Sequence, residues 1–491
     1  MGCAISSRKG KLDGNRHDVD SKGSIKPSAF VAENTNRLTD IYKLGKLLGS
    51  GAYADVRICY LKENGAKRAV KIIKKQSLSG NNIRQKIENE KEIIKSLDHP
   101  NIIRFYEFFE DAKKLYIIME YSNGSEFFSQ ILQNESYSEI QAAKIMYQIF
   151  SILSYLHDKN IAHRDLKPES MLIDKDTLKV IDFAEASVIT TRISQKVGSL
   201  FYSAPEVMFG THTTSCDLWS AGVILYILLT GYHPFSGIND DETLKNIKNI
   251  KYTTTGKIWN QISSLAKELV SLLLCDHSRR ISANDALHHP WILNFTQIFS
   301  PETPIISSAL ENLKHFTNTS VLRDAVHFFL TMQRVSTGDI KILGEVFKKI
   351  DKNDDGKISK QELINEYTNT LGVIQAESEV EKIMKEVDTN NDGYINYTEF
   401  LKAALDIRKM LSIENLRAAF RNFDKDFSGR ISVLELKRVV SERNLLSHKT
   451  WTEILKEVDL NCDGEIDLIE FEKLVLMKGQ AETEENADDK N

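Results

Sequence analysis

The sequence predicts an α+β protein with a small β-rich lobe, a larger helical lobe and a separate all-α domain. Short apolar runs of strand length come first, and longer helical stretches dominate after about Ser138. All eight prolines lie at or before Pro304, which leaves the remainder of the 491-residue chain free to form uninterrupted helices. This order of elements separates a sheet-containing part from a purely helical part.

Strands are predicted where apolar and β-branched residues follow one another in short runs. These runs are RICYL (57–61), RAVKII (68–73) and KLYIIMEY (114–121). Residues 1–40 are polar and lack periodicity, so we expect a flexible arm there, and residues 479–491 form an acidic tail. We expect a two-lobed domain over 41–292, a junction over 293–338 and a helical domain over 339–478.

Composition narrows the class of protein. The chain is 41% hydrophobic and 27% charged, with a net charge of -5, which gives no argument for nucleic-acid binding. The longest apolar run, LWSAGVILYILLTGY from Leu218, contains Ser, Gly and Thr and is predicted to be a buried helix, not a membrane span. The five cysteines have no paired spacing, which favours a reducing cytoplasmic compartment: Cys3, Cys59, Cys216, Cys275 and Cys462.

A repeat of 35 to 37 residues places four similar loops in the C-terminal part of the chain. The loops read DKNDDGKISKQE, DTNNDGYINYTE, DKDFSGRISVLE and DLNCDGEIDLIE and begin at Asp351, Asp388, Asp424 and Asp459. Oxygen-bearing side chains occupy positions 1, 3, 5, 9 and 12, and Gly occupies position 6. Calcium prefers six to eight oxygen ligands of this kind, with position 7 binding through its backbone carbonyl.

The loops resemble EF-hands, and their pairing at 351/388 and 424/459 resembles the two lobes of calmodulin. The third loop has fewer carboxylates than the fourth, and we expect it to bind calcium more weakly. Calcium buffering is the alternative role for this domain. The expected calcium ligands are Asp351, Asn353, Asp355, Lys357, Ser359, Glu362, Asp388, Asn390, Asp392, Tyr394, Asn396, Glu399, Asp424, Asp426, Ser428, Arg430, Ser432, Glu435, Asp459, Asn461, Asp463, Glu465, Asp467 and Glu470.

An ordered series of short motifs between residues 48 and 280 predicts phosphoryl transfer. Such a reaction needs a clamp on the phosphates, a metal ion and a group that orients the acceptor hydroxyl. The motifs are LGSGAYADV (48–56), AVK (69–71), Glu90, HRDLKPES (163–170), IDFAEAS (181–187), SAPE (203–206), DLWSAGV (217–223) and Arg280. Over residues 41–292 this series resembles a serine/threonine protein kinase domain, and the whole chain resembles a calcium-dependent protein kinase.

The resemblance implies ATP between two lobes and assigns roles by position. Asp165 orients or deprotonates the acceptor hydroxyl, Lys167 assists at the γ-phosphate, Lys71 contacts the α- and β-phosphates, and Glu90 anchors Lys71. Magnesium is expected at Asp182 and Ser170. The expected ATP-binding residues are Leu48, Gly49, Ser50, Gly51, Val56, Ala69, Lys71, Met119, Glu120, Glu126, Leu172 and Asp182. Glu206 and Arg280 are expected to form a structural ion pair.

The chain departs from the kinase pattern at Ala54, Ser170 and Ala184. Ala184 costs about 1 kcal/mol if its backbone needs φ > 0. Ser170 replaces an Asn and is a weaker ligand, so a loss of roughly 1 to 3 kcal/mol slows transfer about ten- to a hundredfold. Because Lys71 and the two aspartates remain, we expect an active enzyme; the alternatives are a calcium-regulated pseudokinase scaffold and a calcium buffer with a vestigial kinase domain.

The junction segment 307–330 carries apolar residues at helical spacing: Leu310, Leu313, Phe316, Leu322, Ala325, Val326 and Phe329. In the family this segment is autoinhibitory, so it is expected to block the substrate cleft until calcium-loaded EF-hands bind it. A plain spacer helix is the alternative.

The first residues, MGCAISSRKGK, fit an N-myristoylation signal at Gly2, with palmitoylation of Cys3 or the basic cluster as a second anchor. We therefore expect a cytoplasmic protein associated with membranes; chance occurrence of the motif is the alternative. Expected partners are ATP and proteins whose Ser or Thr follows basic residues, which Glu126 and Glu169 favour.

Overall fold

The computed structural model describes residues 32–34, 37–50, 54–75, 83–127, 131, 137–174, 176–189, 200–208, 210, 213–296, 303–316, 321–406, 410–424, 426, 428–440, 459–461 and 463–476. Gly2, Cys3, Gly51 and the predicted acidic tail lie outside these residues.

The small lobe is built on a six-stranded sheet in the order β1-β5-β6-β4-β3-β2. Its strands are β1 (Ala32–Asn34), β2 (Tyr42–Ser50), β3 (Ala54–Leu61), β4 (Lys67–Lys74), β5 (Phe105–Glu110) and β6 (Lys114–Glu120). The expected strand runs match β3, β4 and β6. Alternating side chains bury opposite faces of β4: Ala69 and Ile73 join the main core, whereas Val70 and Ile72 join a smaller cluster on the other face.

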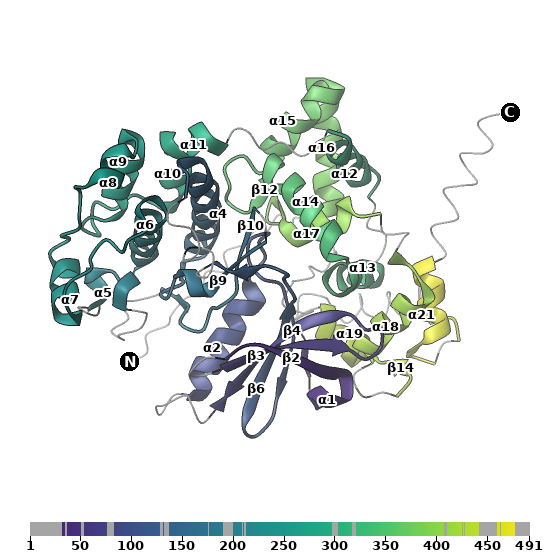
Figure 1. Ribbon diagram of the computed structural model, residues 1–491. Coiled ribbons are helices and arrows are strands. Elements are labelled where there is room, and N and C mark those ends of the chain that lie inside the picture. Colours follow the sequence, from purple (N-terminus) through teal and green to yellow (C-terminus); the bar gives the residue numbers. More distant parts are fainter. Residues whose placement is uncertain are drawn as a thin grey trace, which may run out of the picture.

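Two helices accompany this sheet, the short α1 (Leu38–Ile41) and the longer α2 (Ile83–Ser96). Ile93 and Ile94 of α2 are buried in the main core together with Phe108 and Ile117 of the sheet. This packing places α2 beside the sheet (Figure 1). Glu90 of α2 can therefore reach Lys71 of β4.

The larger lobe is helical and surrounds two long helices, α4 (Glu139–Asp158) and α6 (Ser215–Thr230). Ser138 caps α4 with a reciprocal capping box, which fixes where the helix begins. Every residue of α6 from Cys216 to Thr230 is buried, so the long apolar run is a core helix, as predicted. The other helices are α5 (Pro205–Met208), α7 (Asp240–Lys248), α8 (Lys257–Gln261), α9 (Ser264–Leu273), α10 (Ala283–Leu287) and α11 (Pro290–Thr296).

Short strands and turns at the inner edge of the large lobe carry the chemistry-bearing loops. The strands are β7 (Ser125–Glu126), β8 (Ile161–Ala162), β9 (Met171–Asp174), β10 (Thr177–Val180) and β11 (Ser187–Val188), and the 3-10 turns are η3 (Pro168–Ser170) and η4 (Leu200–Tyr202). The antiparallel pairs β9–β10 and β8–β11 hold residues 163–170 beside residues 181–187.

The C-terminal part forms two separate helical lobes. The first contains α14 (Thr337–Ile350), α15 (Lys360–Leu371), α16 (Val373–Val387) and α17 (Tyr397–Ala404), with strands β12 (Lys357–Ser359) and β13 (Tyr394–Asn396). The second contains α18 (Ile413–Phe423), α19 (Val433–Val440) and α21 (Leu468–Leu476), with strands β14 (Arg430–Ile431) and β15 (Ile466–Asp467).

The junction consists of two helices, α12 (Thr303–His315) and α13 (Val321–Arg334), and each lobe buries one of them. Leu310 and Leu313 of α12 lie in the core of the first lobe, against Val346 and Phe347. Leu322 and Val326 of α13 lie in the core of the second lobe. The predicted boundary at residue 292 falls inside α11, whose Trp291 and Ile292 belong to the core of the large lobe.

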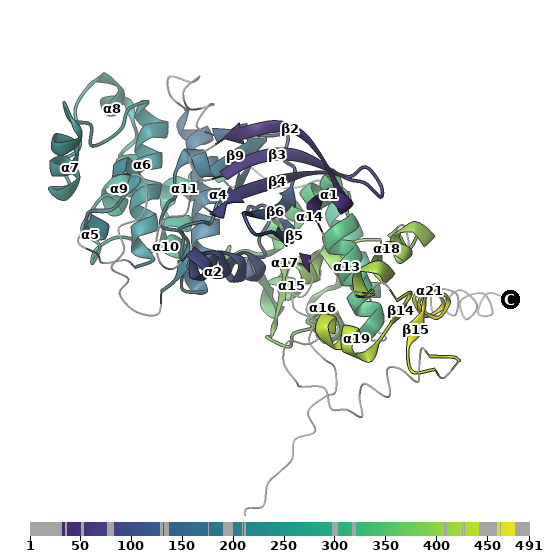
Figure 2. The same cartoon turned by 90° about the horizontal axis from the view of Figure 1, so that it is seen from below.

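Figures 1 and 2 both show α13 beside the small lobe. Two arginines of the small lobe explain this position: Arg104, just before β5, donates to the carbonyl of Thr331 (3.0 Å), and Arg68 of β4 donates to the carbonyl of Gln333 (3.2 Å). Cations at the carboxyl end of a helix satisfy its last carbonyls and complement its dipole. The junction is therefore anchored to the small lobe at its C-terminal end.

The first helical lobe also rests on both lobes of the two-lobed domain. Asp98, in the loop between α2 and β5, accepts hydrogen bonds from the backbone and hydroxyl of Thr398 (2.8 and 2.7 Å), and Tyr147 of α4 donates to Asp354 (2.5 Å). A Cβ at Gly356 would lie 2.7 Å from the ring of Tyr155, so only glycine allows this approach.

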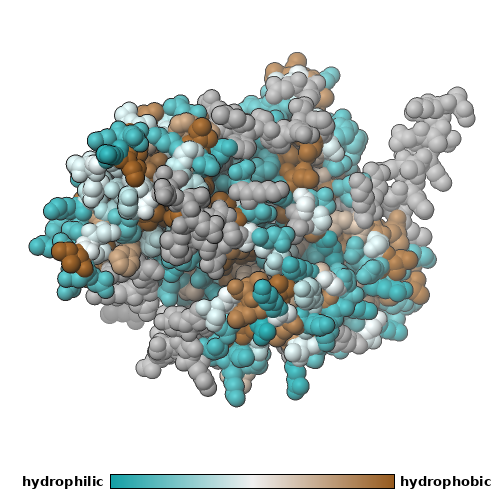
Figure 3. All heavy atoms as spheres, viewed as in Figure 1, coloured by the Kyte–Doolittle hydropathy of each residue, from teal (hydrophilic) through white to brown (hydrophobic). Residues whose placement is uncertain are grey.

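Figure 3 shows hydrophilic residues over most of the coloured surface in that view, with hydrophobic residues in separate patches. None of the helices in the described part of the chain has both the length and the apolar character needed to cross a membrane.

Candidate active site and calcium loops

The candidate active site centres on a lysine with a 13% exposed side chain that is held by two carboxylates. Lys71 of β4 lies 2.7 Å from Asp182 and 3.4 Å from Glu90 of α2. Burial alone would lower the pKa of Lys71, but the two carboxylates raise it above its usual value. Burial alone would raise the pKa of Asp182, but Lys71 lowers it to about 2, so this carboxylate stays ionised.

The catalytic loop is fixed by a buried aspartate of α6. Asp217 accepts hydrogen bonds from the backbone N–H groups of His163 and Arg164 (both 2.8 Å) and from His157 (3.0 Å). These bonds hold Arg164 at a φ of 69°, a left-handed conformation that costs free energy without such support. The sequence shows DLWSAGV as a motif, but its role as the support of residues 163–165 is visible only in the fold.

The loop presents Asp165 and Lys167 together, with the Lys167 Nζ 2.5 Å from the Asp165 Oδ2. Ser170 lies at the end of η3, and its hydroxyl donates to the carbonyl of Lys167 at 2.7 Å. The expected ion pair is also present: Arg280 and Glu206 are 2.5 Å apart and buried in the large lobe.

The strand register brings the expected ATP-binding residues to one end of the sheet. Val56 lies opposite both Gly49 and Lys71, and Ala69 lies opposite Met119. In the large lobe, the backbone of Glu126 pairs with Leu172. Leu48 is 46% exposed and Ser50 donates to Asp55 at the end of the same hairpin, whereas Gly51 lies outside the described residues.

The carboxylate of Glu120 is engaged by other residues and does not support a direct role in nucleotide binding. It accepts hydrogen bonds from Lys179 (2.9 Å) and from the backbone of Arg104 (3.2 Å). Glu120 is thus expected to contact a nucleotide through its backbone only, since its side chain ties the strand to the large lobe.

Ala184 does not carry the backbone strain that its substitution for glycine suggested. The φ of Ala184 is not positive, and its N–H donates to Asp182 at 3.3 Å. The expected penalty of about 1 kcal/mol therefore does not apply.

An Ala184→Gly variant is accordingly expected to change the phosphoryl-transfer rate less than about twofold, because no strain is relieved. Steady-state assays of the wild type and the variant check this. A rate increase of tenfold or more in the variant would contradict the assigned backbone conformation.

The calcium loops share one internal pattern of hydrogen bonds. The carboxylate at position 1 of each loop accepts from the glycine N–H at position 6: Asp351 at 3.0 Å, Asp388 and Asp424 at 2.9 Å, and Asp459 at 2.8 Å. These glycines have φ between 78° and 86°, the left-handed turn that wraps the loop. Ile358 pairs with Ile395 and Ile431 with Ile466, which confirms the predicted pairing of the loops.

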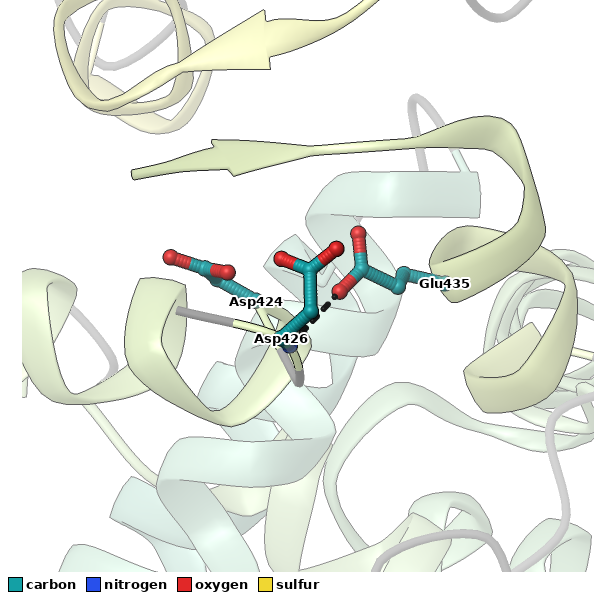
Figure 4. Close-up of side chains that lie close together, drawn as sticks. All are labelled: Asp424, Asp426 and Glu435. Carbon is teal, nitrogen blue, oxygen red and sulfur yellow. Dashed lines mark hydrogen bonds between the residues drawn. The ribbon is translucent and has the colours of Figure 1, made fainter. Parts of the chain in front are cut away.

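The donor sets of the loops suit a divalent cation. In the third loop, oxygen atoms of Asp424, Asp426 and Glu435 lie within 4.8 Å of one another, and Figure 4 shows these side chains gathered at the loop. Burial and neighbouring carboxylates raise the pKa of Asp351 to about 9, and burial raises that of Glu399 to about 7. Such crowding of carboxylates is stabilised by a bound cation, and hard oxygen ligands favour calcium.

Comparisons with known proteins agree with this architecture. The protein kinase domain family matches residues 42–292, and the EF-hand domain pair matches residues 341–405 and 413–476. The fold and the site thus define a protein kinase domain joined to two EF-hand pairs.

Curated relatives match most of the chain. Calcium-dependent protein kinase 4 of Plasmodium berghei (strain Anka) is 36% identical over 476 residues, covering 93% of this chain and 90% of the relative. Calcium-dependent protein kinase 3 of the same organism is 38% identical over 464 residues, covering 91% and 82%. The chain belongs to the calcium-dependent protein kinase family. It is a calcium-activated serine/threonine kinase, and the pseudokinase alternative is not supported.

Proposed function

We propose that the chain transfers the γ-phosphoryl group of magnesium-bound ATP to Ser and Thr of proteins and that its junction helices couple this reaction to calcium. The proposal rests on the burial of the two junction helices by two different EF-hand lobes. The first lobe buries α12 and the second buries α13, and the end of α13 is bonded to Arg104 and Arg68 of the kinase domain, so the junction connects the lobes to that domain.

The roles of the cleft residues follow from their contacts. Lys71, held by Glu90 and Asp182, supplies positive charge to the phosphates. Asp165 accepts the proton of the acceptor hydroxyl, and Lys167, 2.5 Å from it, stabilises charge on the transferred group. Asp182 would hold magnesium, which neutralises phosphate charge when bound; Ser170 was the second ligand expected from the sequence.

Calcium acts through the helix-burying surface of each EF-hand lobe. The Ca²⁺-binding residues are the expected ones at positions 1, 3, 5, 7, 9 and 12 of the four loops. With calcium bound, the lobes hold α12 and α13; without calcium, the released junction occupies the substrate cleft and inhibits transfer. The burial of Leu310 and Leu313 against Val346 and Phe347 supports the bound arrangement.

Alanine substitution of Leu310, Leu313 and Phe316 tests this switch. These side chains pack in or against the core of the first EF-hand lobe, so their removal weakens its hold on α12. We expect a changed ratio of calcium-stimulated to basal activity in a peptide phosphorylation assay. If both rates equal those of the wild type, the junction is a passive spacer.

We further propose that Gly2 is myristoylated and Cys3 palmitoylated, so that the kinase works at a cytoplasmic membrane surface. The supporting observation is the sequence MGCAIS followed by Arg8, Lys9 and Lys11. Glu169 is exposed on η3, which supports the proposed preference for basic residues before the acceptor.

A Gly2→Ala variant is expected to lose most of its binding to membranes, because a single acyl chain binds only marginally, with an association constant of about 10⁴ M⁻¹ for myristate, and stable anchoring needs two signals. Fractionation of cells expressing the wild type, Gly2→Ala and a matched Gly10→Ala control checks this. Retention of Gly2→Ala in the membrane fraction would contradict acylation as the anchor.

A further inference from the structure

Ser170 stands where the kinase pattern has a metal-binding Asn, and its hydroxyl is used within its own turn. The Oγ donates to the carbonyl of Lys167 at 2.7 Å and accepts from the Lys167 N–H at 3.3 Å. The residue is only 3% exposed. A hydroxyl that is buried and bonded in this way is not available as a ligand in the nucleotide cleft.

The same residue connects the catalytic loop to the strand that leads to Asp182. The backbone N–H of Ser170 donates to the carbonyl of Lys167 (3.0 Å), and its own carbonyl accepts from the N–H of Ile181 (3.0 Å). Ser170 thereby fixes the backbone of Lys167 relative to the residue that precedes Asp182. The spacing between Lys167 and Asp182 is important because both residues are to act on the same triphosphate.

Asp182, unlike Ser170, has a partly exposed side chain whose oxygen can bind a metal ion. Its side chain is 43% exposed, and its Oδ1 takes the hydrogen bonds from Lys71 and Ala184. Within the described ranges, its Oδ2 has no hydrogen-bond donor and is available as a ligand. The one convergent group of three acidic or other metal-binding side chains in those ranges is Asp424, Asp426 and Glu435, far along the chain in the third calcium loop.

We infer that the nucleotide site holds a single divalent cation on Asp182 and that Ser170 is a positioning residue for Lys167, not a metal ligand. This inference rests on the proposed use of magnesium-bound ATP. It revises the expectation that Ser170 binds magnesium: the short side chain satisfies its hydroxyl on the Lys167 backbone. Lys71 and Lys167 then provide positive charge that a second cation would otherwise supply.

Counting cations tests the first half of the inference. The full-length kinase, saturated with calcium, is titrated with Mn²⁺ with and without a non-hydrolysable ATP analogue, and free Mn²⁺ is followed by electron paramagnetic resonance. We expect one nucleotide-dependent Mn²⁺ per chain in the wild type and in Ser170→Ala, two in Ser170→Asn, and none in Asp182→Asn. Two in the wild type, falling to one in Ser170→Ala, would overturn the inference alone. No nucleotide-dependent Mn²⁺ in the wild type would overturn the magnesium–ATP proposal as well.

Kinetics tests the second half. Ser170→Ala is expected to lower kcat about tenfold with little change in the KM for ATP, because Lys167 is misplaced in the transition state while the nucleotide remains bound. Ser170→Thr keeps the hydroxyl and is expected to restore kcat. Ser271 of α9 makes the same kind of bond, to the carbonyl of Glu268 at 2.7 Å, so Ser271→Ala is the matched control. An unchanged kcat in Ser170→Ala would show that the hydroxyl does not position Lys167.

Discussion

Replacing Lys402 with alanine is expected to abolish most of the calcium stimulation of this kinase while leaving its basal rate intact. Lys402 of α17 is fully buried and lies 2.5 Å from Asp324 of α13, whose side chain is 3% exposed. Its Nζ also lies 5.3 Å from the ring centroid of Phe316, next to α12. One lysine of the first EF-hand lobe therefore contacts both segments of the junction.

The size of the effect follows from the unpaired charge that the substitution leaves behind. Removing one partner of a buried ion pair costs about 3 to 5 kcal/mol, because the remaining charge is desolvated without compensation. If the junction-bound state bears that cost, the population of activated kinase falls roughly a hundredfold or more.

Transfer rates with and without calcium measure this loss, and hydrogen exchange of α13 reports its release. Lys382→Ala is the matched control, since Lys382 is 70% exposed and pairs only at the surface with Glu379. A double variant, Lys402→Met with Asp324→Leu, removes both charges and is expected to recover part of the stimulation. Normal stimulation in Lys402→Ala would contradict the coupling of α13 to the first lobe.

Replacing Lys71 with methionine is expected to lower kcat by about 10²- to 10³-fold at saturating calcium, as removal of one preorganised charge donor does in other active sites. Lys71 is held between Glu90 and Asp182, and methionine has a similar length without the charge. The two carboxylates then repel each other, so Asp182 is also displaced from the position that a cation requires.

Single-turnover phosphoryl transfer to a peptide distinguishes loss of chemistry from loss of binding. Lys67 lies on the same strand, over the ring of Tyr121, and Lys67→Met provides the control for a lysine of β4 outside the cleft. A Lys71→Met kinase that retains more than about a tenth of the wild-type rate would show that this charge is not central to catalysis.

Local patterns were sufficient to predict the parts of this protein that depend on neighbouring residues. Each calcium loop closes within twelve residues, so its glycine and carboxylates are visible in the sequence and adopt the predicted turn. The strand runs and the buried helix α6 follow from periodicity and length in the same way. The contact of Lys71 with Glu90 was predicted through the resemblance to the kinase family, whereas its contact with Asp182 was not.

Contacts between distant segments had no such local sign. Asp98 and Thr398 are separated by 300 residues, and Tyr147 and Asp354 by 207, so nothing in either segment indicates the other. The sequence gives no sign that Lys402 is buried, because a lysine is usually exposed, whereas here Asp324 compensates for its burial. The conformation of Ala184 and the hydrogen bonds of Ser170 likewise depend on backbone geometry that the residue types alone do not fix.

Phosphate transfer from ATP to a peptide with basic residues before its serine, compared with and without calcium, measures the central activity directly. Transfer is expected to require calcium and magnesium, to disappear in Asp165→Asn, and to persist in a control with the exposed Asp176→Asn substitution. Nucleotide binding without transfer at saturating calcium and magnesium, or equal transfer by the wild type and Asp165→Asn, would contradict it.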